Sequence, residues 1–209
     1  QGSSSQQGAN EKTERLLSDN RPAEALPILA NLVLNGEESD PAYQESQFLM
    51  ARALFALNLP LASSYAFGDI AEMGEAHPRY FETIDWFLKI QRKLPGDEES
   101  LTRLAEYDPF LYPPQDADEI RYLVGRHHYN IEDFELALES LEAVEQQSGV
   151  LYLKAQYFIG VIRTRQNEAT PALEAFKNIL RYQRDIDDSS EIKAIADMAI
   201  LSLGRLFYT

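Results

Sequence analysis

Apolar residues recur at spacings of three and four along most of this chain, which is the period of an α-helix. The pattern is clear from Phe48 to Leu57 and from Tyr152 to Ile162, and the breaks between such segments carry Pro, Gly, Asn and Asp. No segment shows the sustained alternation and turn dipeptides of a β-hairpin. We therefore predict eleven helices and no sheet, near residues 9–19, 22–35, 41–57, 60–74, 79–93, 97–106, 116–129, 133–146, 150–166, 169–183 and 190–207.

An internal repeat links these helices in pairs. In two consecutive segments, a glycine on one helix is followed at fixed distances by three apolar residues of the next helix. The first segment has Gly125 with Ala137, Leu141 and Val144, and the second has Gly160 with Ala172, Phe176 and Ile179. In both segments the steps are 12, then 4, then 3 residues, so the two helix pairs are built on one plan.

These steps, with apolar residues just before the small one, resemble the tetratricopeptide repeat (TPR), a helix-turn-helix unit of about 34 residues. The same frame falls on Thr13, Ala51, Leu88 and Gly204, so the resemblance covers almost the whole chain. It implies an all-α fold, namely a right-handed α-solenoid of about five and a half repeats in which each pair packs on its neighbours. Because a bulky residue, Leu88, occupies one small-residue position, we expect irregular repeats.

The first residues of the chain lack this periodicity. Residues 1–8 are mostly Ser, Gln and Gly, and we expect a flexible tail there, with the solenoid spanning 9–209. The start, Gln1-Gly2-Ser3, is compatible with a protease-site remnant of recombinant expression and equally with the mature end left by signal-peptide cleavage.

The last repeat is spaced differently from the others. A step of 44 residues separates Gly160 from Gly204, which implies an insertion, and the acidic and polar segment from Asp185 to Ser190 is the natural place for this loop. The segment from Leu201 to Tyr208 resembles a first helix whose small-residue face needs a second helix. We therefore expect the chain to be a fragment of a longer repeat array.

The charge balance of the chain restricts its partners. It has 34 Asp and Glu against 19 Lys and Arg, giving a formal net charge of −15. A protein that contacts nucleic acid or an anionic membrane surface needs an excess of basic residues, so we predict neither partner. No apolar run approaches the roughly 20 residues of a membrane span, and we predict no direct membrane insertion. With no Cys in the chain, disulfides and thiolate chemistry are excluded.

Sequence signatures of catalysis are missing. The chain has no Gly-rich phosphate loop, no Gly-x-Ser-x-Gly turn and no His pair at the spacing of a helical zinc site. We therefore predict that it is not an enzyme, with no cofactor, no metal site and no catalytic residue. Of its three histidines, His77 precedes Pro78 and is expected to be exposed, and His128 is expected to be packed against a partner helix and hydrogen-bonded.

A candidate binding site emerges when the repeats are aligned. In the repeat family the first helices line a concave groove, and here the residue after the small position is basic in four of five units, with aromatic residues one turn before or after it. The candidate groove residues are Phe48, Arg52, Phe55, Lys89, Arg92, Tyr122, Arg126, Tyr129, Tyr157 and Arg205. Two interpretations remain open: the arginines bind a partner's carboxylates, or they pair with Glu on adjacent helices while the rings pack between helices.

Three hypotheses of function follow from this resemblance. The first is a non-catalytic scaffold that binds a protein or peptide, with acidic or C-terminal carboxylate groups, in its concave groove. The resemblance would place such a scaffold in a larger bacterial assembly of the envelope, motility or secretion, with the periplasm favoured over the cytoplasm. The alternatives are a structural spacer or oligomerisation module, and a helical regulatory domain of a longer enzyme. The sequence leaves the oligomeric state open.

Overall fold

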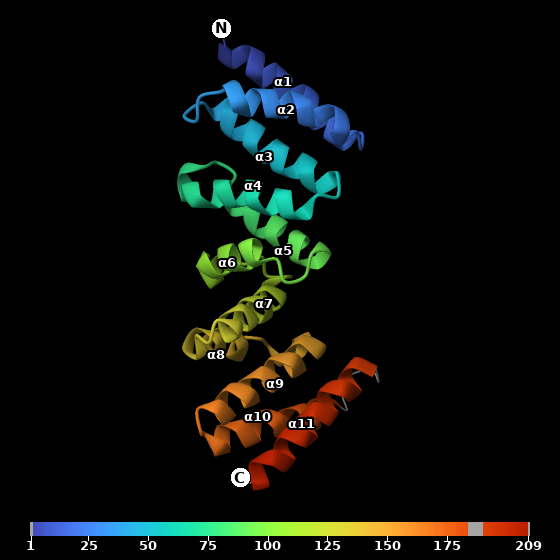
Figure 1. Ribbon diagram of the computed structural model, residues 1–209, viewed down its shortest axis with the longest axis vertical. Helices are drawn as coiled ribbons and strands as arrows, with labels where there is room; N and C mark the ends of the chain where they lie inside the picture. The colour runs from blue at the N-terminus through green and yellow to red at the C-terminus, as the bar shows by residue number, and fades with distance from the viewer. Residues whose placement is uncertain (1, 184–189, 209) are drawn as a thin grey trace. The chain divides into compact units, whose positions relative to one another are not determined.

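The fold is all-α, as the hydrophobic period predicts. A computed structural model describes residues 2–183 and 190–208 of the chain, and within these ranges it contains eleven α-helices and no strand. The helices form two compact units, Gln1–Tyr107 and Asp108–Thr209. In Figure 1 the first unit runs from blue to green and the second from yellow-green to red. None of the described helices is both long and apolar enough to cross a lipid bilayer.

The first unit is a succession of six helices. These are α1 (Gly2–Ser18), α2 (Pro22–Asn35), α3 (Pro41–Ala56), α4 (Pro60–Met73), α5 (Thr83–Lys93) and α6 (Glu98–Glu106), with 3₁₀ turns η1 (Gly74–Ala76) and η2 (Tyr80–Glu82) before α5. Each helix packs on the next, and α1 also contacts α3 while α4 contacts α6. Proline opens α2, α3 and α4, where its fixed φ favours the first turn and its missing N–H costs nothing.

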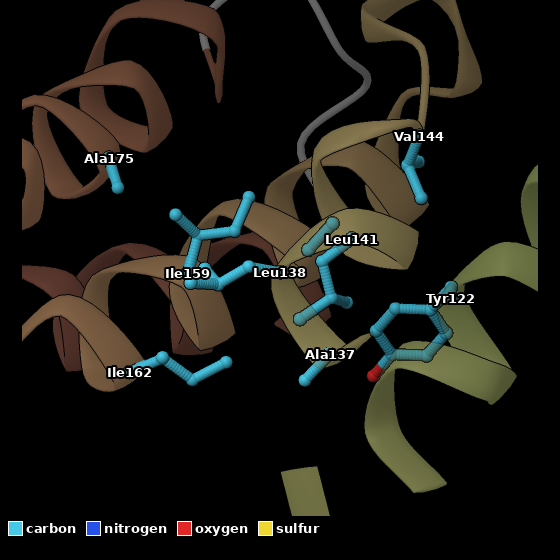
Figure 2. Packing of buried hydrophobic residues seen from close by; sticks show 9 residues of the cluster. Tyr122, Ala137, Leu138, Leu141, Val144, Ile159, Ile162 and Ala175 are labelled. Carbon is cyan, nitrogen blue, oxygen red and sulfur yellow. The ribbon is translucent and has the colours of Figure 1, made fainter. Parts of the chain in front are cut away.

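The second unit repeats this succession with five helices. They are α7 (Ala117–Asn130), α8 (Phe134–Glu142), α9 (Val150–Arg165), α10 (Ala169–Tyr182) and α11 (Ser190–Tyr208), with 3₁₀ turns η3 (Pro109–Leu111) and η4 (Gln146–Ser148). Helix α9 packs on α7, α8, α10 and α11. Figure 2 shows the core between α7, α8 and α9, where Leu141 and Ile159 lie among the buried side chains.

The two glycines that define the repeat frame lie where helices touch. A Cβ atom on Gly125 would be 2.6 Å from Leu141 Cγ, and one on Gly160 would be 2.6 Å from Phe176 Cε1. Both distances are far shorter than a normal carbon contact of about 3.5–4.0 Å, so only glycine allows these helix pairs to approach so closely. The predicted register of the two repeats is confirmed at these positions.

The first helix begins earlier than the sequence suggested. Residues 2–8, which we expected to form a flexible tail, belong to α1, which starts at Gly2 rather than near residue 9. Further along, α1 is tied to α3: Asn10 donates its amide to the carbonyl of Ala42 at 2.7 Å and accepts a 2.8 Å hydrogen bond from the hydroxyl of Ser46. These contacts with α3 stabilise α1, whose start, rich in Ser and Gly, has a low helix propensity by itself. At the other end, residues 185–189 of the expected acidic loop lie outside the described residues, and α11 begins at Ser190.

Two histidine predictions need correction. His77 is 1% exposed and not on the surface, because its ring is enclosed between the turn it occupies and α3. Its Nε2 donates to the carbonyl of Gln44 at 3.2 Å, and its Nδ1 accepts from the backbone N–H of Arg79 at 3.0 Å. His128 is packed as expected, but its Nδ1 has no hydrogen-bond partner in the described part of the chain.

We expect the buried His77 to make stability depend on pH. Burial lowers the pKa of His77 below its usual value, and its Nδ1 must stay unprotonated to accept from Arg79. The unfolded chain therefore binds more protons than the folded one below pH about 6.5, and the free energy of unfolding should fall as the pH decreases through that range. Urea unfolding at pH 7.5 and 5.5 tests this. His77→Gln should show a weaker decrease than the parent, and equal decreases would contradict the assignment.

Candidate functional site

A cluster of aromatic and basic side chains joins α7 to α9 in the second unit. The guanidinium carbon of Arg126 lies 5.8 Å from the ring centroid of Tyr122 on its own helix and 5.7 Å from that of Phe158 on α9. Tyr129 meets Phe158 edge to face at 5.1 Å, and Arg165 lies over Tyr129 at 5.3 Å. We call these five residues the α7–α9 cluster. Its alternating cations and ring faces are held together by attraction to the aromatic quadrupole.

The first unit contains the same arrangement between α3 and α5. Its members are Phe48, Arg52, Phe55, Trp86 and Lys93, which we call the α3–α5 cluster. Arg52 lies over both Phe48 (5.9 Å) and Trp86 (6.0 Å). Phe55 meets Trp86 edge to face at 5.5 Å, and the Lys93 ammonium lies 4.7 Å from the Phe55 centroid. Each contact has its counterpart in the α7–α9 cluster, so the two clusters form one motif built twice.

Sequence reasoning found three members of each cluster and missed two. The missed residues are Trp86 and Lys93 in the first unit and Phe158 and Arg165 in the second. In the repeat frame, Trp86 and Phe158 both lie two residues before the small position, while Lys93 and Arg165 both lie five residues after it. Aligning all positions of the repeat, and not only those on one helical face, would have revealed this shared aromatic and basic pattern.

The two interpretations of the arginines are each realised in one unit. Nη1 of Arg52 lies 3.0 Å from both carboxylate oxygens of Glu14 on α1, so Arg52 is paired as the packing interpretation predicts. Arg126 is exposed, its contacts are with aromatic rings, and no carboxylate partner for it is found among the described residues. A guanidinium held over rings still presents its N–H edge to a ligand. Arg126 is therefore available to an incoming carboxylate, in contrast to Arg52.

The other candidate residues differ in accessibility. Phe48, at 2% exposed, packs edge to face on Phe67 and is not an open contact surface. Lys89 is exposed, with its ammonium 4.1 Å from the Trp86 centroid, and Arg92 is exposed near the end of α5. The half-buried Tyr157 lies 5.9 Å from Phe158, and Arg205 is exposed on α11.

A cleft of about 790 Å³ lies beside the α3–α5 cluster, between α1, the first half of α3 and η2. Its walls carry three arginines, Arg15, Arg52 and Arg79, and the last two are neutralised by carboxylates. Arg52 is paired with Glu14, and Arg79 makes two hydrogen bonds to Glu45, at 3.0 and 3.1 Å. An anionic ligand would also meet five carboxylates on the same walls, those of Glu11, Glu14, Asp40, Glu45 and Glu82. This cleft is therefore a weaker anion site than the exposed edge of Arg126.

The α7–α9 cluster contains one ionisable phenol with a shifted pKa and no His, Asp or Glu. Burial raises the pKa of Tyr122 above its usual value, although Arg126 opposes the shift, so the phenol stays neutral near pH 7. Among the described residues, no group of three or more His, Asp or Glu side chains could hold a metal ion.

No protein family profile matches the chain, and no curated protein or solved structure is significantly similar to it.

Proposed function

We propose that this protein is a non-catalytic scaffold of the TPR type, a right-handed α-solenoid of about five and a half repeats that binds a segment of another protein. The proposal rests on the shared repeat frame, in which Gly125 and Gly160 take the same close contact with the following helix. The α7–α9 cluster is the part of the second unit that would engage the segment.

Arg126 carries the proposal. It is exposed, held by Tyr122 and Phe158, and has no carboxylate partner among the described residues, although the chain has an excess of acidic residues. Its partner would be a peptide segment with acidic side chains or a C-terminal carboxylate next to apolar residues. The guanidinium would take the carboxylate as a charge-assisted hydrogen bond. The half-buried rings of Tyr129 and Phe158 would supply rigid apolar area, whereas Tyr122, at 8% exposed, supports the guanidinium from below and is not itself an open surface as the sequence had suggested. On the strength of the repeat resemblance, we place this scaffold within a larger bacterial assembly, with the envelope favoured.

Replacing Arg126 by alanine should weaken peptide binding and leave stability nearly unchanged. The probes are fluorescein-labelled peptides with one shared apolar core and a Glu-rich or Lys-rich flank, each with a free or an amidated C-terminus. We expect the Glu-rich peptides to bind more tightly in fluorescence anisotropy. Arg126→Ala should reduce that affinity by a factor of about 10 to 100, which corresponds to about 1–3 kcal/mol for a charged hydrogen bond. Added salt should weaken the binding.

Arg52→Ala is the matched control, since Arg52 occupies the same repeat position but is already paired. It leaves Glu14 without its partner and should lower the free energy of unfolding by up to about 1 kcal/mol, as for other partly exposed ion pairs. Its effect on the affinity for the peptide should be small. If no peptide of the panel binds, or if Arg126→Ala lowers stability without changing affinity, the cluster is structural and the proposal fails.

A further inference from the structure

The cleft beside the α3–α5 cluster has a net negative lining. It lies within the first unit, bounded on one side by α1 and on the other by η2, and its volume is about 790 Å³. Ligand pockets in proteins are typically about 300–1,000 Å³, so the cleft has room for a short segment of another chain. Five carboxylates and three guanidinium groups line it, which leaves a formal charge of −2. We call it the α1–α3 cleft.

Most of these charged groups neutralise one another inside the cleft. Arg52 is paired with Glu14 at 3.0 Å. Arg79 is paired with Glu45 at 3.0 Å and with Glu82 at 2.6 Å. The charge that remains for a ligand therefore comes from the other members of the lining.

The two paired arginines show how this cleft holds a cation. Both guanidinium carbons lie over the ring of Phe48, that of Arg52 at 5.9 Å and that of Arg79 at 5.3 Å from its centroid. Each guanidinium thus has an aromatic ring and a carboxylate as neighbours, and both neighbours attract a positive charge. The surroundings of Phe48 already contain their cations, so an additional cation would bind on the side of α1.

Two carboxylates of the lining retain free oxygens. Glu11 is exposed on α1, and its side chain has no ion pair or hydrogen bond among the described residues. Asp40 caps α3: its Oδ1 accepts from the backbone N–H of Ala42 at 2.8 Å, and its Oδ2 has no partner in the part of the chain that the structure describes. The side chain of Arg15 is the opposing charge, exposed on the same helix as Glu11.

We propose that the α1–α3 cleft binds a basic segment of a partner protein, with a Lys or Arg side chain received by Glu11 and Asp40. Charge-assisted hydrogen bonds to the two carboxylates would hold the cation. The exposed Pro41, next to Asp40, would supply apolar surface for the methylene stem of the side chain. The net charge of −15 attracts a basic partner from a distance. This site lies in the first unit and does not depend on the peptide binding proposed for Arg126.

Fluorescence anisotropy with the full chain tests the proposal. The probe is a fluorescein-labelled peptide in which two Arg flank an apolar residue, and its neutral counterpart has Gln in place of both Arg. We expect the Arg peptide to bind with a dissociation constant of about 100 µM and the Gln peptide to bind at least about tenfold more weakly. Glu11→Gln combined with Asp40→Asn should raise the constant for the Arg peptide by a factor of about 10 to 30. Asn is as good a helix cap as Asp, so this variant keeps α3 intact.

Glu75→Gln combined with Asp19→Asn is the matched control. These two exposed carboxylates of the first unit lie outside the cleft, and the control variant loses the same amount of negative charge. It should change the dissociation constant by no more than about twofold, because salt screens distant charges. Arg15→Gln should lower the constant by about two- to fivefold, since it removes the opposing charge from the cleft. Circular dichroism checks that each variant is folded.

Three results would overturn the proposal. The first is equal weakening by the cleft variant and the control variant, which would show a general attraction to an acidic protein. The second is the absence of binding by the Arg peptide. The third is binding of spermidine without binding of the peptide in isothermal titration calorimetry, which would assign the cleft to a small cation. Arg126→Ala should leave the affinity for the Arg peptide unchanged, and Arg126 is itself tested with acidic peptides, so each proposal can fail without the other.

Discussion

Gly160→Leu should lower the free energy of unfolding by about 1–3 kcal/mol, the usual cost of forcing extra volume into a packed contact. A Cβ at this position would already lie 2.6 Å from both Cε1 and Cζ of the Phe176 ring. That ring is only 1% exposed and has no room to move aside, so α9 and α10 must separate. Gly160→Ala should show a smaller loss, since it adds one carbon and improves the helix propensity.

Gly204→Leu is the matched control for this prediction. It is the same substitution at the same repeat position, but nothing lies within 4 Å of the added Cβ. It should be neutral or stabilise the protein by up to about 1 kcal/mol, because leucine is a better helix former than glycine. Urea denaturation followed by circular dichroism measures both variants. Equal effects at Gly160 and Gly204 would mean that the contact of Gly160 with Phe176 does not limit packing.

Asp97→Ala should destabilise the first unit by about 2–4 kcal/mol, through a lost helix cap and unsatisfied buried donors. Asp97 is 7% exposed at the start of α6. Its Oδ2 accepts from the backbone N–H of Ser100 at 3.0 Å and from the hydroxyls of Ser100 and Ser64 at 2.7 and 2.5 Å. The hydroxyl of Ser64 comes from α4, so the carboxylate links two helices as well as capping one.

The control for Asp97 is the exposed cap of α8. Asp133 accepts from the backbone N–H of Leu136 at 3.3 Å, and in the described part of the chain its carboxylate makes no buried hydrogen bond to another helix. Asp133→Ala should therefore cost only about 0.5–1 kcal/mol. Asp97→Asn should lie between the two alanine variants, because an amide oxygen can still accept but carries no charge. Thermal and urea unfolding compare the three. A loss for Asp97→Ala no larger than for Asp133→Ala would show that the buried network contributes little.

The position and length of most helices could be predicted from local pattern. Nearly every helix begins and ends within a few residues of its predicted bounds. The signals that set these bounds are local: the apolar period, proline in the first turn, and glycine or asparagine at the breaks each depend on a few neighbouring residues. The contacts of Gly125 and Gly160 were predictable for a related reason. A fixed step between a glycine and a bulky residue in two consecutive segments implies the same contact twice.

The two clusters of aromatic and basic residues were only partly predictable from the sequence. Tyr122, Arg126 and Tyr129 lie on one face of one helix, and spacing alone places them together. Their partners Phe158 and Arg165 come from the next helix pair, and the rotation between successive pairs decides which residues meet. That rotation arises from packing of whole helices, which the spacing within one helix does not report.

Arg52 and Arg126 show most clearly that spacing within one helix does not determine contacts between helices. Both were chosen from one repeat position, yet Arg52 is paired with Glu14 while Arg126 lies over two rings. The same position of the preceding repeat is occupied by Glu14 in the case of Arg52, but by Lys89 in the case of Arg126. The sequence therefore specified helices, caps and repeat register, all of which depend on residues close together in the chain. Which arginine is paired, which histidine is buried and which glycine is open depend on neighbours from other helices, and these are brought together only when the helices pack.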